Sequence, residues 1–364
     1  MTRNAMHPMA AQGSAVDFNL SPFVVIWENT RACDLACVHC RAAAQSKRNR
    51  FELTTEQGYR LIDQIAELKP KVFVLTGGDP LKREDTYDLI QYARNQGLEP
   101  SLTPSATPLL TEEAVSKMKR HGLGRMAVSL DASNAAEHDD FRRVSGSFDI
   151  TLRAIRAASR EEIPVQVNTT VTRRTIADLP NMVKLLEELG ITMWSVFFAV
   201  PTGRAKNSDL VSAEEVEDLF GFLYETSKRV PFSIRTTEAM HYRRYVLQHG
   251  GAMPLGVQPN GAPRAPRGVN EAKGFVFISH IGDVYPSGFL PLKAGNVSQQ
   301  SLGDIYRTSP LFMGLRDPNN LHGKCGRCEF RDLCGGSRAR AWAMTGDVYA
   351  SDPLCLYQPA EMVQ

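Results

Sequence analysis

The sequence predicts an α/β protein that is built on a parallel β-sheet and is followed by a smaller C-terminal domain. Two observations support this prediction. Between residues 22 and 230, six short apolar runs alternate with amphipathic stretches, and after residue 230 the alternation stops. Strict alternation of strand and helix is typical of parallel strands joined by right-handed crossover helices. Six pairs are fewer than the eight of a closed barrel, so we expect a partial barrel.

Each pair combines an apolar run of strand length with a stretch of helical periodicity. In the first pair, the run from Phe23 to Trp27 is apolar, and Leu61, Ile62 and Ile65 follow at helical spacing. The expected strand and helix ranges are, in order, 23–27 with 55–68, 72–75 with 85–96, 99–103 with 112–121, 125–130 with 147–158, 165–171 with 177–189, and 192–200 with 213–228.

The rest of the chain has a different character. Residues 249–269 are rich in Gly, Pro, Asn and Arg, which predicts a long loop. Residues 274–279 and 283–285 predict a small hairpin. We therefore expect a flexible N-terminal segment over 1–20, a barrel over 21–230, and a linker with a C-terminal domain over 231–364.

The composition limits where the protein works and what it binds. Seven cysteines, an odd number, and the lack of a signal-peptide pattern do not suit a secreted disulfide framework, so we expect a reducing cytoplasm. No apolar run approaches the roughly 18 residues that a membrane span needs. A net charge of +2 is too small to indicate a nucleic acid or an anionic membrane as partner.

The cysteines form a group of three and a group of four. Cys33, Cys37 and Cys40 make a C-x3-C-x2-C motif after the first strand, where functional loops of parallel barrels lie. The motif alone fits part of a zinc site or an iron–sulfur cluster, in which three thiolates leave one iron open. At the end of the second strand, Gly77, Gly78 and Asp79 precede a proline, and the glycines allow a ligand to approach the backbone closely.

Together these motifs resemble the radical S-adenosylmethionine (radical SAM) superfamily, over residues 22 to about 205. The resemblance implies a partial (β/α)6 TIM-like barrel. It also implies a [4Fe–4S] cluster on Cys33, Cys37 and Cys40 whose open iron binds SAM. One electron then cleaves SAM to methionine and a 5′-deoxyadenosyl radical, which removes hydrogen from the substrate. An electron donor such as flavodoxin or ferredoxin would supply that electron.

Further residues match the SAM site of this family. Gly77, Gly78 and Asp79 would line the site of the methionyl amino group, with Asp79 in place of the more frequent Glu. His39 replaces the usual aromatic residue before the third cysteine. Ser129 and Asp131, after the fourth strand, and Asn168, on the fifth, fall where the family contacts SAM, although such residues are also common backbone caps. Arg142, with Arg143 as competitor, would pair with the SAM carboxylate.

The second group, Cys325, Cys328, Cys334 and Cys355, has no nearby histidine of ligand spacing and fits either a closed zinc site or a closed iron–sulfur cluster. Beside a radical SAM core it resembles the SPASM/twitch extension, whose full form carries two auxiliary clusters. Here Ser287 and Arg338 stand where further cysteine ligands are expected. The resemblance therefore implies one auxiliary [4Fe–4S] cluster, which either transfers electrons or holds the domain together.

Weaker similarities limit the range of expected substrates. Five segments look most like the haem-biosynthesis branch: Trp27–Cys33, Cys37–Ala42, Gly295–Val297, Cys334–Arg340 and Thr345–Asp347. The resemblance implies action on tetrapyrrole side chains, for example by oxidative decarboxylation of propionates. Arginines in the C-terminal half could bind propionates or be surface charges: Arg235, Arg243, Arg244, Arg264, Arg267, Arg338 and Arg340. The main alternative is radical modification of a ribosomally made peptide; the short stretch before the first strand leads us to expect no fused leader-binding domain. A third alternative is a non-catalytic iron–sulfur or zinc sensor.

Overall fold

The computed structural model describes residues 17–251 and 268–362, and within them the chain is organised around one sheet of ten strands. The strands lie in the order β10-β9-β8-β1-β2-β3-β4-β5-β6-β7, so β10 and β7 are the two edges and the sheet does not close. Neighbouring strands from β8 through β1 to β7 are parallel. The pairs β8–β9 and β9–β10 are antiparallel. The expected partial parallel barrel is confirmed.

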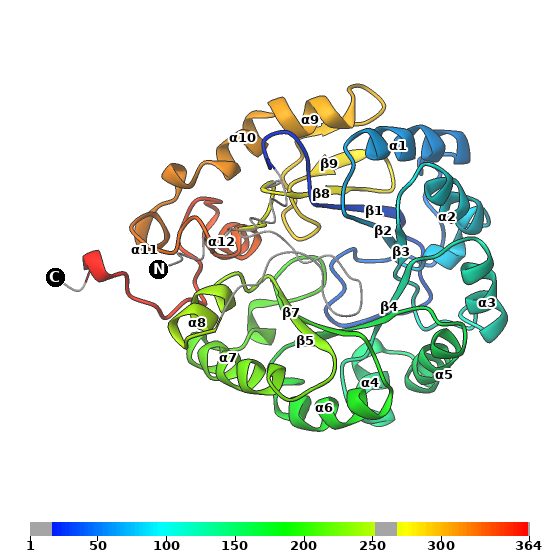
Figure 1. The fold of residues 1–364 in the computed structure, drawn as a ribbon, viewed down its shortest axis with the longest axis horizontal. Coiled ribbons are helices and arrows are strands. Elements are labelled where there is room, and N and C mark those ends of the chain that lie inside the picture. The colour runs from blue at the N-terminus through cyan, green and yellow to red at the C-terminus, as the bar shows by residue number, and fades with distance from the viewer. Residues whose placement is uncertain (1–16, 252–267, 363–364) are drawn as a thin grey trace, which may run out of the picture.

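The strands are short and separated by helices along the chain. Their bounds are β1 Val24–Thr30, β2 Val72–Gly77, β3 Pro100–Leu102, β4 Arg125–Ser129, β5 Val165–Val171, β6 Met193–Phe198, β7 Ser233–Thr237, β8 Phe275–Ile278, β9 Asp283–Tyr285 and β10 Gly295–Asn296. The helices of the barrel are α1 Thr55–Glu67, α2 Thr86–Asn95, α3 Glu112–Arg120, α4 Ala135–Arg142, α5 Ser147–Arg160, α6 Leu179–Glu188 and α7 Ala213–Ser227. They surround the outside of the curved sheet (Figure 1).

The C-terminal part adds shorter helices at one side of the barrel (Figure 1). These are α8 Tyr242–Gln248, α9 Leu302–Thr308, α10 Pro310–Arg316, α11 Gly323–Gly326 and α12 Arg338–Thr345. Helix α9 lies against α1, where the amide of Leu302 donates to the side chain of Gln64 at 2.7 Å. Among the helices of the described residues, none combines the length and apolar character that crossing a bilayer requires.

Six expected pairs are present, but the prediction that the alternation stops at residue 230 is wrong. Strand β7 and helix α8 follow α7, and β8 pairs in parallel with β1 while also forming the expected hairpin with β9. The sequence analysis did not predict β7, because its sequence, Ser-Ile-Arg-Thr-Thr, has only one large apolar residue. The sequence analysis did not predict α4, because this helix is short and largely polar. Most of the loop expected over 249–269 and of the segment expected over 1–20 lies outside the described residues.

The first strand and helix show how the sequence builds this layer. Thr54 caps α1, accepting from the amide of Gln57, whose side chain accepts in return from the amide of Thr54. Trp27 of β1 is fully buried beneath the helix. A Cβ on Gly58 would lie 2.9 Å from the Trp27 ring, so the glycine allows the indole and α1 to pack closely. Burial of such an aromatic side chain contributes roughly 1.5–3 kcal/mol.

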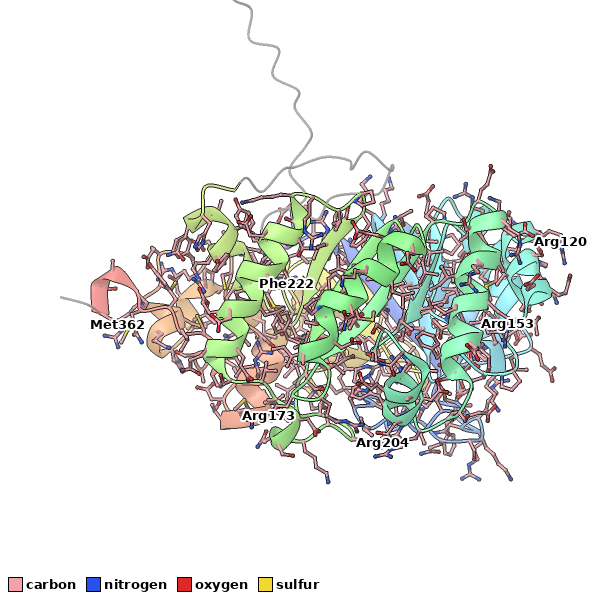
Figure 2. The ribbon with its side chains drawn as sticks, turned by 90° about the horizontal axis from the view of Figure 1, so that it is seen from below. Arg120, Arg153, Arg173, Arg204, Phe222 and Met362 are labelled. Carbon is pink, nitrogen blue, oxygen red and sulfur yellow. The ribbon has the colours of Figure 1, made fainter. Side chains whose placement is uncertain are left out.

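The inner side of the barrel is more polar than the side facing the helices. Side chains of a strand alternate between the two sides, and the valines of β5 belong to the core that includes helix residues. Asn168 of β5 lies in register with Ser129 of β4 and Ser195 of β6, so these three side chains share the inner face. Because parallel strands end at the same edge, the loops after them meet there. In Figure 2, Arg173 and Arg204, which follow β5 and β6, lie along one edge of the molecule.

Candidate active site

The first three cysteines lie together on the loop between β1 and α1. Cys33 and Cys37 are buried with Leu35 in a small apolar cluster, and Cys40 packs against it. Polar hydrogens point at the sulfur atoms: the amide of Leu35 lies 3.3 Å from Cys33 Sγ and the amide of Ala44 lies 3.5 Å from Cys40 Sγ. Such donors stabilise negatively charged sulfur, which is the form that binds metal. The structure thus brings the predicted cysteines together.

Gly77 and Gly78 allow the cysteine loop to pack against the end of β2. A Cβ on Gly77 would lie 2.6 Å from the carbonyl oxygen of Thr30, and one on Gly78 would lie 2.5 Å from that of Ala32. The amide of Gly78 donates to Thr30 O at 2.8 Å. The close approach that requires these glycines is therefore backbone against backbone, whereas the motif in the sequence had suggested a ligand.

Asp79 is fully buried and its carboxylate is satisfied inside the protein. It accepts hydrogen bonds from the hydroxyl of Thr107 at 2.7 Å and from the amides of Leu81 and Ser105 at 3.2 and 3.3 Å. Burial raises the pKa of Asp79, while these hydrogen bonds act in the opposite direction. The side chain braces the loops after β2 and β3 beside the cysteines.

The loop after β6 closes over the cysteine loop. Gly203 has φ +65°, and a Cβ there would lie 2.3 Å from the carbonyl oxygen of Cys40. The next residue, Arg204, donates its amide to Cys40 O at 3.0 Å and its Nε to Cys37 O at 2.8 Å. Arg204 was not among the residues that the sequence analysis expected at the site. Its backbone amide and its guanidinium together hold two of the three cysteine positions.

Arg142 is buried between a carboxylate and a cysteine. Its guanidinium forms an ion pair with Asp131 and its Nη1 lies 3.5 Å from Cys37 Sγ. Burial would raise the pKa of Asp131, but the charge of Arg142, together with the neighbouring histidines and the amide of Thr170, holds it below the usual value. Arg143, the competing candidate, lies at the surface in an ion pair with Asp140. The structure therefore places Arg142, and not Arg143, at the cysteine site.

Two other predicted residues lie nearby on the inner face. Ser129 ends β4, and Asn168 accepts from the side chain of Gln166 at 2.8 Å. His39 stacks on Phe141 with ring centroids 4.5 Å apart, so it fills an aromatic position with an aromatic ring. Burial, helped by Arg142, lowers the pKa of His39 to about 3, which keeps it neutral.

A charged cluster on the inner wall escaped the sequence analysis. Glu28 of β1 forms an ion pair with Arg41 at 2.8 Å and lies 3.2 Å from His280 Nδ1. The Arg41 guanidinium also lies 4.6 Å from the ring centroid of Phe277 and donates to Gly288 O at 3.2 Å. Two features of the sequence could have indicated this cluster: Glu28 is an acidic residue in an apolar strand, and Arg41 directly follows the third cysteine.

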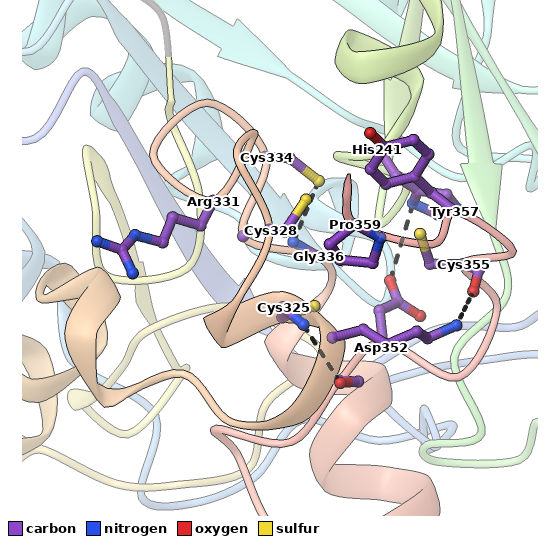
Figure 3. A pocket seen from close by; sticks show the side chains of 13 residues that line it. His241, Cys325, Cys328, Arg331, Cys334, Gly336, Asp352, Cys355, Tyr357 and Pro359 are labelled. Carbon is purple, nitrogen blue, oxygen red and sulfur yellow. Dashed lines mark hydrogen bonds and ion pairs between the residues drawn. The ribbon is translucent and has the colours of Figure 1, made fainter. Parts of the chain in front are cut away.

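The four C-terminal cysteines line one cavity (Figure 3). The amide of Gly336 lies 3.3 Å from Cys334 Sγ, and Arg338 Nη2 lies 3.7 Å from Cys325 Sγ. Burial raises the pKa of Cys328 and Cys334, and that of Cys355 to about 11, so these thiols hold their protons until a metal displaces them. In the ranges 17–251 and 268–362, no three Cys, His, Asp or Glu side chains converge on a single ion position, so the sulfurs surround a space.

His241 also lines this cavity, although it lies 84 residues before Cys325. It is fully buried, and its Nδ1 lies 3.8 Å from Asp352 Oδ2. The sequence gave no sign of it because strand β7, which positions it, was not predicted.

Ser287 and Arg338, which replace expected cysteine ligands, take part in buried polar contacts. Ser287 donates to Glu238 at 3.3 Å, and Ser337 donates to the other oxygen of the same carboxylate. Burial, together with the neighbouring Glu271, raises the pKa of Glu238 well above its usual value. Arg338 donates to the carbonyl oxygens of Val348 and Ala350.

The arginines considered for propionates have mostly structural partners. Arg243 donates to the carbonyl oxygens of Leu333 and Val269, Arg244 holds Glu217 through two bonds of 2.6 Å, and Arg340 is buried against Asp352. Arg264 and Arg267 lie outside the described residues. Four of the seven, counting Arg338, are therefore internal braces and not surface charges.

An open parallel barrel with three cysteines on the loop after β1 defines the class of protein. A family model described as the radical SAM superfamily matches residues 27–186. The chain is 38% identical over 343 residues to an AdoMet-dependent heme synthase of Methanosarcina barkeri, which covers 94% of this chain and 98% of that protein. It is 39% identical over 343 residues to one of Nitratidesulfovibrio vulgaris, covering 93% of each. The chain belongs to the radical SAM superfamily and is an enzyme.

Solved structures confirm the fold. Streptococcus suis SuiB bound to S-adenosylmethionine superposes with a TM-score of 0.72 at 17% identity, covering 93% of this chain and 78% of that one. The structure titled native anSMEcpe with bound AdoMet and Cp18Cys peptide gives a TM-score of 0.66, covering 92% and 94%. Family membership implies a [4Fe–4S] cluster and SAM, and the three clustered thiols beside β1 fit such a cluster.

Proposed function

We propose that this enzyme converts propionate side chains of a tetrapyrrole by radical oxidative decarboxylation, in a branch of haem biosynthesis. The observation that carries the proposal is 38–39% identity, over 92–94% of the chain, to three proteins named AdoMet-dependent heme synthase. Two other relatives have tetrapyrrole names: Fe-coproporphyrin III synthase at 30% and pre-heme d1 synthase at 28% identity. These names support a tetrapyrrole substrate. The non-catalytic sensor is left without support.

We assign Cys33, Cys37 and Cys40 as ligands of a [4Fe–4S] cluster with an open iron. When bound, cluster and SAM supply the 5′-deoxyadenosyl radical, which this family uses for hydrogen abstraction. The protein positions the cluster ligands. Arg204 and Arg142 hold the cysteine loop in place, and Gly77 and Gly78 at the end of β2 allow that loop to pack closely against the strand. Residues proposed to surround SAM are Gly77, Gly78, Asp79, Ser129, Asp131, Arg142 and Asn168. Asp79 and Arg142 already have protein partners, so we expect them to act chiefly by holding the site in shape.

We assign Cys325, Cys328, Cys334 and Cys355 to one auxiliary [4Fe–4S] cluster in the part of the chain that follows residue 231. A single zinc ion would draw four sulfurs to about 2.3 Å from one centre. Within the part of the chain that the structure describes, no three Cys, His, Asp or Glu side chains converge on one ion position, and this favours a larger group. Oxidation of a substrate radical releases an electron, and a closed cluster could accept it.

The inner wall carries aromatic side chains of the kind that stack on planar rings. Phe197 of β6 lies with its ring centroid 6.4 Å from that of Phe289. Arg41 is already paired with Glu28 and covers Phe277, so it is not assigned to a substrate carboxylate. Seven cysteines without disulfides are consistent with a reducing cytoplasm, where flavodoxin or ferredoxin would donate the electron.

The test is deoxyadenosine formation by the reduced, iron-loaded enzyme with iron coproporphyrin III and with porphyrinoids lacking propionates. We expect the propionate-bearing substrate alone to stimulate deoxyadenosine release above the uncoupled background and to lose carbon dioxide. No stimulation by any tetrapyrrole would refute the proposal.

Peptide modification is the second candidate, because mycofactocin maturase MftC of Mycobacterium tuberculosis is 29% identical over 350 residues. Stimulation by a precursor peptide and by no porphyrinoid would favour it.

A further inference from the structure

An exposed basic stretch follows the three cysteines of the first site. Lys47, Arg48 and Arg50 lie at the surface of the loop between β1 and α1, and residues 45–51 include no acidic residue. Phe51 is 65% exposed, more than any other large apolar side chain that the structure describes. We call residues 47–51 the basic segment. Aromatic and arginine side chains are among the types that are enriched in protein–protein interfaces.

Hydrogen bonds hold the basic segment beside the first site. Just before the segment, the carbonyl oxygen of Gln45 accepts from the amide of Cys33 at 2.7 Å. Just after it, the buried carboxylate of Glu52 accepts from Arg48 Nε at 2.7 Å and from the hydroxyl of Thr30 at 2.6 Å. Both ends of the segment are therefore fixed to the chain that carries the cysteines.

Most of the charge of the basic segment is available to a partner. Lys47 and Arg50 form no ion pair within residues 17–251 and 268–362, and the Arg50 guanidinium lies 4.6 Å from the ring centroid of Phe51. Asp34, the acidic residue among the three cysteines, is paired with Lys82 at 2.6 Å, so it does not cancel this charge. A surface patch of one charge sign attracts partners of the opposite sign and raises the rate of encounter.

We propose that the basic segment is part of the docking surface for a small acidic electron-transfer protein that reduces the first cluster. This inference rests on the [4Fe–4S] cluster that the proposed function assigns to Cys33, Cys37 and Cys40. In the step, the donor protein is oxidised by one electron and the cluster is reduced by one, while no covalent bond forms or breaks. Interfaces of electron-transfer proteins are small, so charge on the surface contributes strongly to their formation.

The experiment measures the binding of oxidised flavodoxin and oxidised ferredoxin to the iron-loaded full chain by calorimetry. K47E/R50E should weaken binding about tenfold at low salt. The matched control is K119E/R120E, which reverses one lysine and one arginine on the exposed face of α3. Figure 2 shows Arg120 away from the edge that carries Arg204, which binds the cysteine loop. We expect this control to bind like the parent.

SAM cleavage without any tetrapyrrole separates docking from damage to the site. With limiting reduced flavodoxin or ferredoxin, K47E/R50E should release deoxyadenosine about tenfold more slowly than the parent. With dithionite, a small reductant that needs no docking surface, the two should be equal. The parent alone gives a further test that holds even if K47E/R50E fails to fold. Its binding should weaken as salt rises, because the screening length falls from about 30 Å at 0.01 M to about 10 Å at 0.1 M.

The outcomes separate this inference from the proposed function. Binding that does not respond to salt, or an equal loss in K47E/R50E and K119E/R120E, would overturn the docking surface. So would a parent that binds a duplex oligonucleotide but neither electron-transfer protein. A parent that cleaves no SAM even with dithionite would overturn the cluster assignment, and this inference with it. None of these results depends on the identity of the substrate.

Discussion

Gly203 holds the loop after β6 against the cysteine loop, and its replacement by alanine should disturb the first cysteine site. A Cβ at this position would lie 2.3 Å from the carbonyl oxygen of Cys40 and 2.4 Å from that of Arg41, whereas ordinary contact begins near 3.4 Å. The two loops must then separate by about 1 Å. They cannot do so freely, because Arg204 binds the carbonyl oxygens of Cys37 and Cys40.

The expected loss has two parts. The first is the cost of φ +65° for alanine, about 1–2 kcal/mol. The second is displacement of the cysteines, and an error of about 1 Å in a reacting geometry can cost about 10²-fold in rate. We therefore expect Gly203→Ala to lower SAM cleavage about 10²-fold. Iron at the first site should fall, while iron at the C-terminal cysteines remains.

Gly190→Ala is the matched control. Gly190 has φ +64°, but no atom lies within 4 Å of the position that a Cβ would take, so the substitution carries only the backbone cost. We expect it to lower the free energy of unfolding by about 1–2 kcal/mol and to leave iron content and SAM cleavage unchanged. Iron analysis, deoxyadenosine release and urea denaturation measure these quantities. If Gly203→Ala behaved like Gly190→Ala in all three assays, the packing argument would be refuted.

Three other predictions follow from the same structure. Changing Cys33, Cys37 and Cys40 to alanine should abolish SAM cleavage and lower the iron content from about eight to about four per chain, and retention of eight would contradict the assignment. Arg142→Gln should lower the free energy of unfolding in urea by about 3–5 kcal/mol, because it leaves Asp131 buried and unpaired; adding Asp131→Asn should recover part of the loss. Since the pKa of Glu238 is raised in the folded state, its protonation stabilises the fold fully below the unfolded pKa near 4.5, and that stability is lost as pH rises through the folded pKa. Glu238→Gln should therefore flatten the decline in unfolding free energy above pH 5, and an unchanged slope would contradict it.

Periodicity was sufficient for the regular part of the fold. The six expected pairs are present because their apolar residues are dense enough to show a period, as in α1, where Leu61, Ile62 and Ile65 are buried. β7 could not be found in this way, since all its residues are partly exposed and its strand character depends on pairing with β6. His241 was missed with it, because proximity to Cys325 arises only from the fold.

The roles of single residues were harder to predict than their location. Gly77 and Gly78 were correctly placed beside the cysteines, yet their collision partners are the carbonyl groups of residues 30–32. A sequence can indicate that a position does not tolerate a Cβ, but it does not show which atoms that Cβ would contact. Arg142 was expected to face a ligand carboxylate, and the structure pairs it with the carboxylate of Asp131. The expected contact of Arg142 with the SAM carboxylate therefore stays a prediction.

The two cysteine sites share one structural device, which explains why so many arginines are internal. At the first site, Arg204 binds the carbonyl oxygen of Cys37 while Arg142 approaches its sulfur. At the second, Lys324 binds the carbonyl oxygen of Cys355 at 2.7 Å, and Arg338 binds two carbonyl oxygens and approaches Cys325 Sγ. At each site one cation fixes an irregular loop through carbonyl oxygens, and Arg142 or Arg338 places positive charge beside sulfur that becomes negative when it binds metal. Because a neutral side chain of the same length could keep the hydrogen bond but not the charge, substitution by glutamine should weaken metal binding more than it weakens the fold.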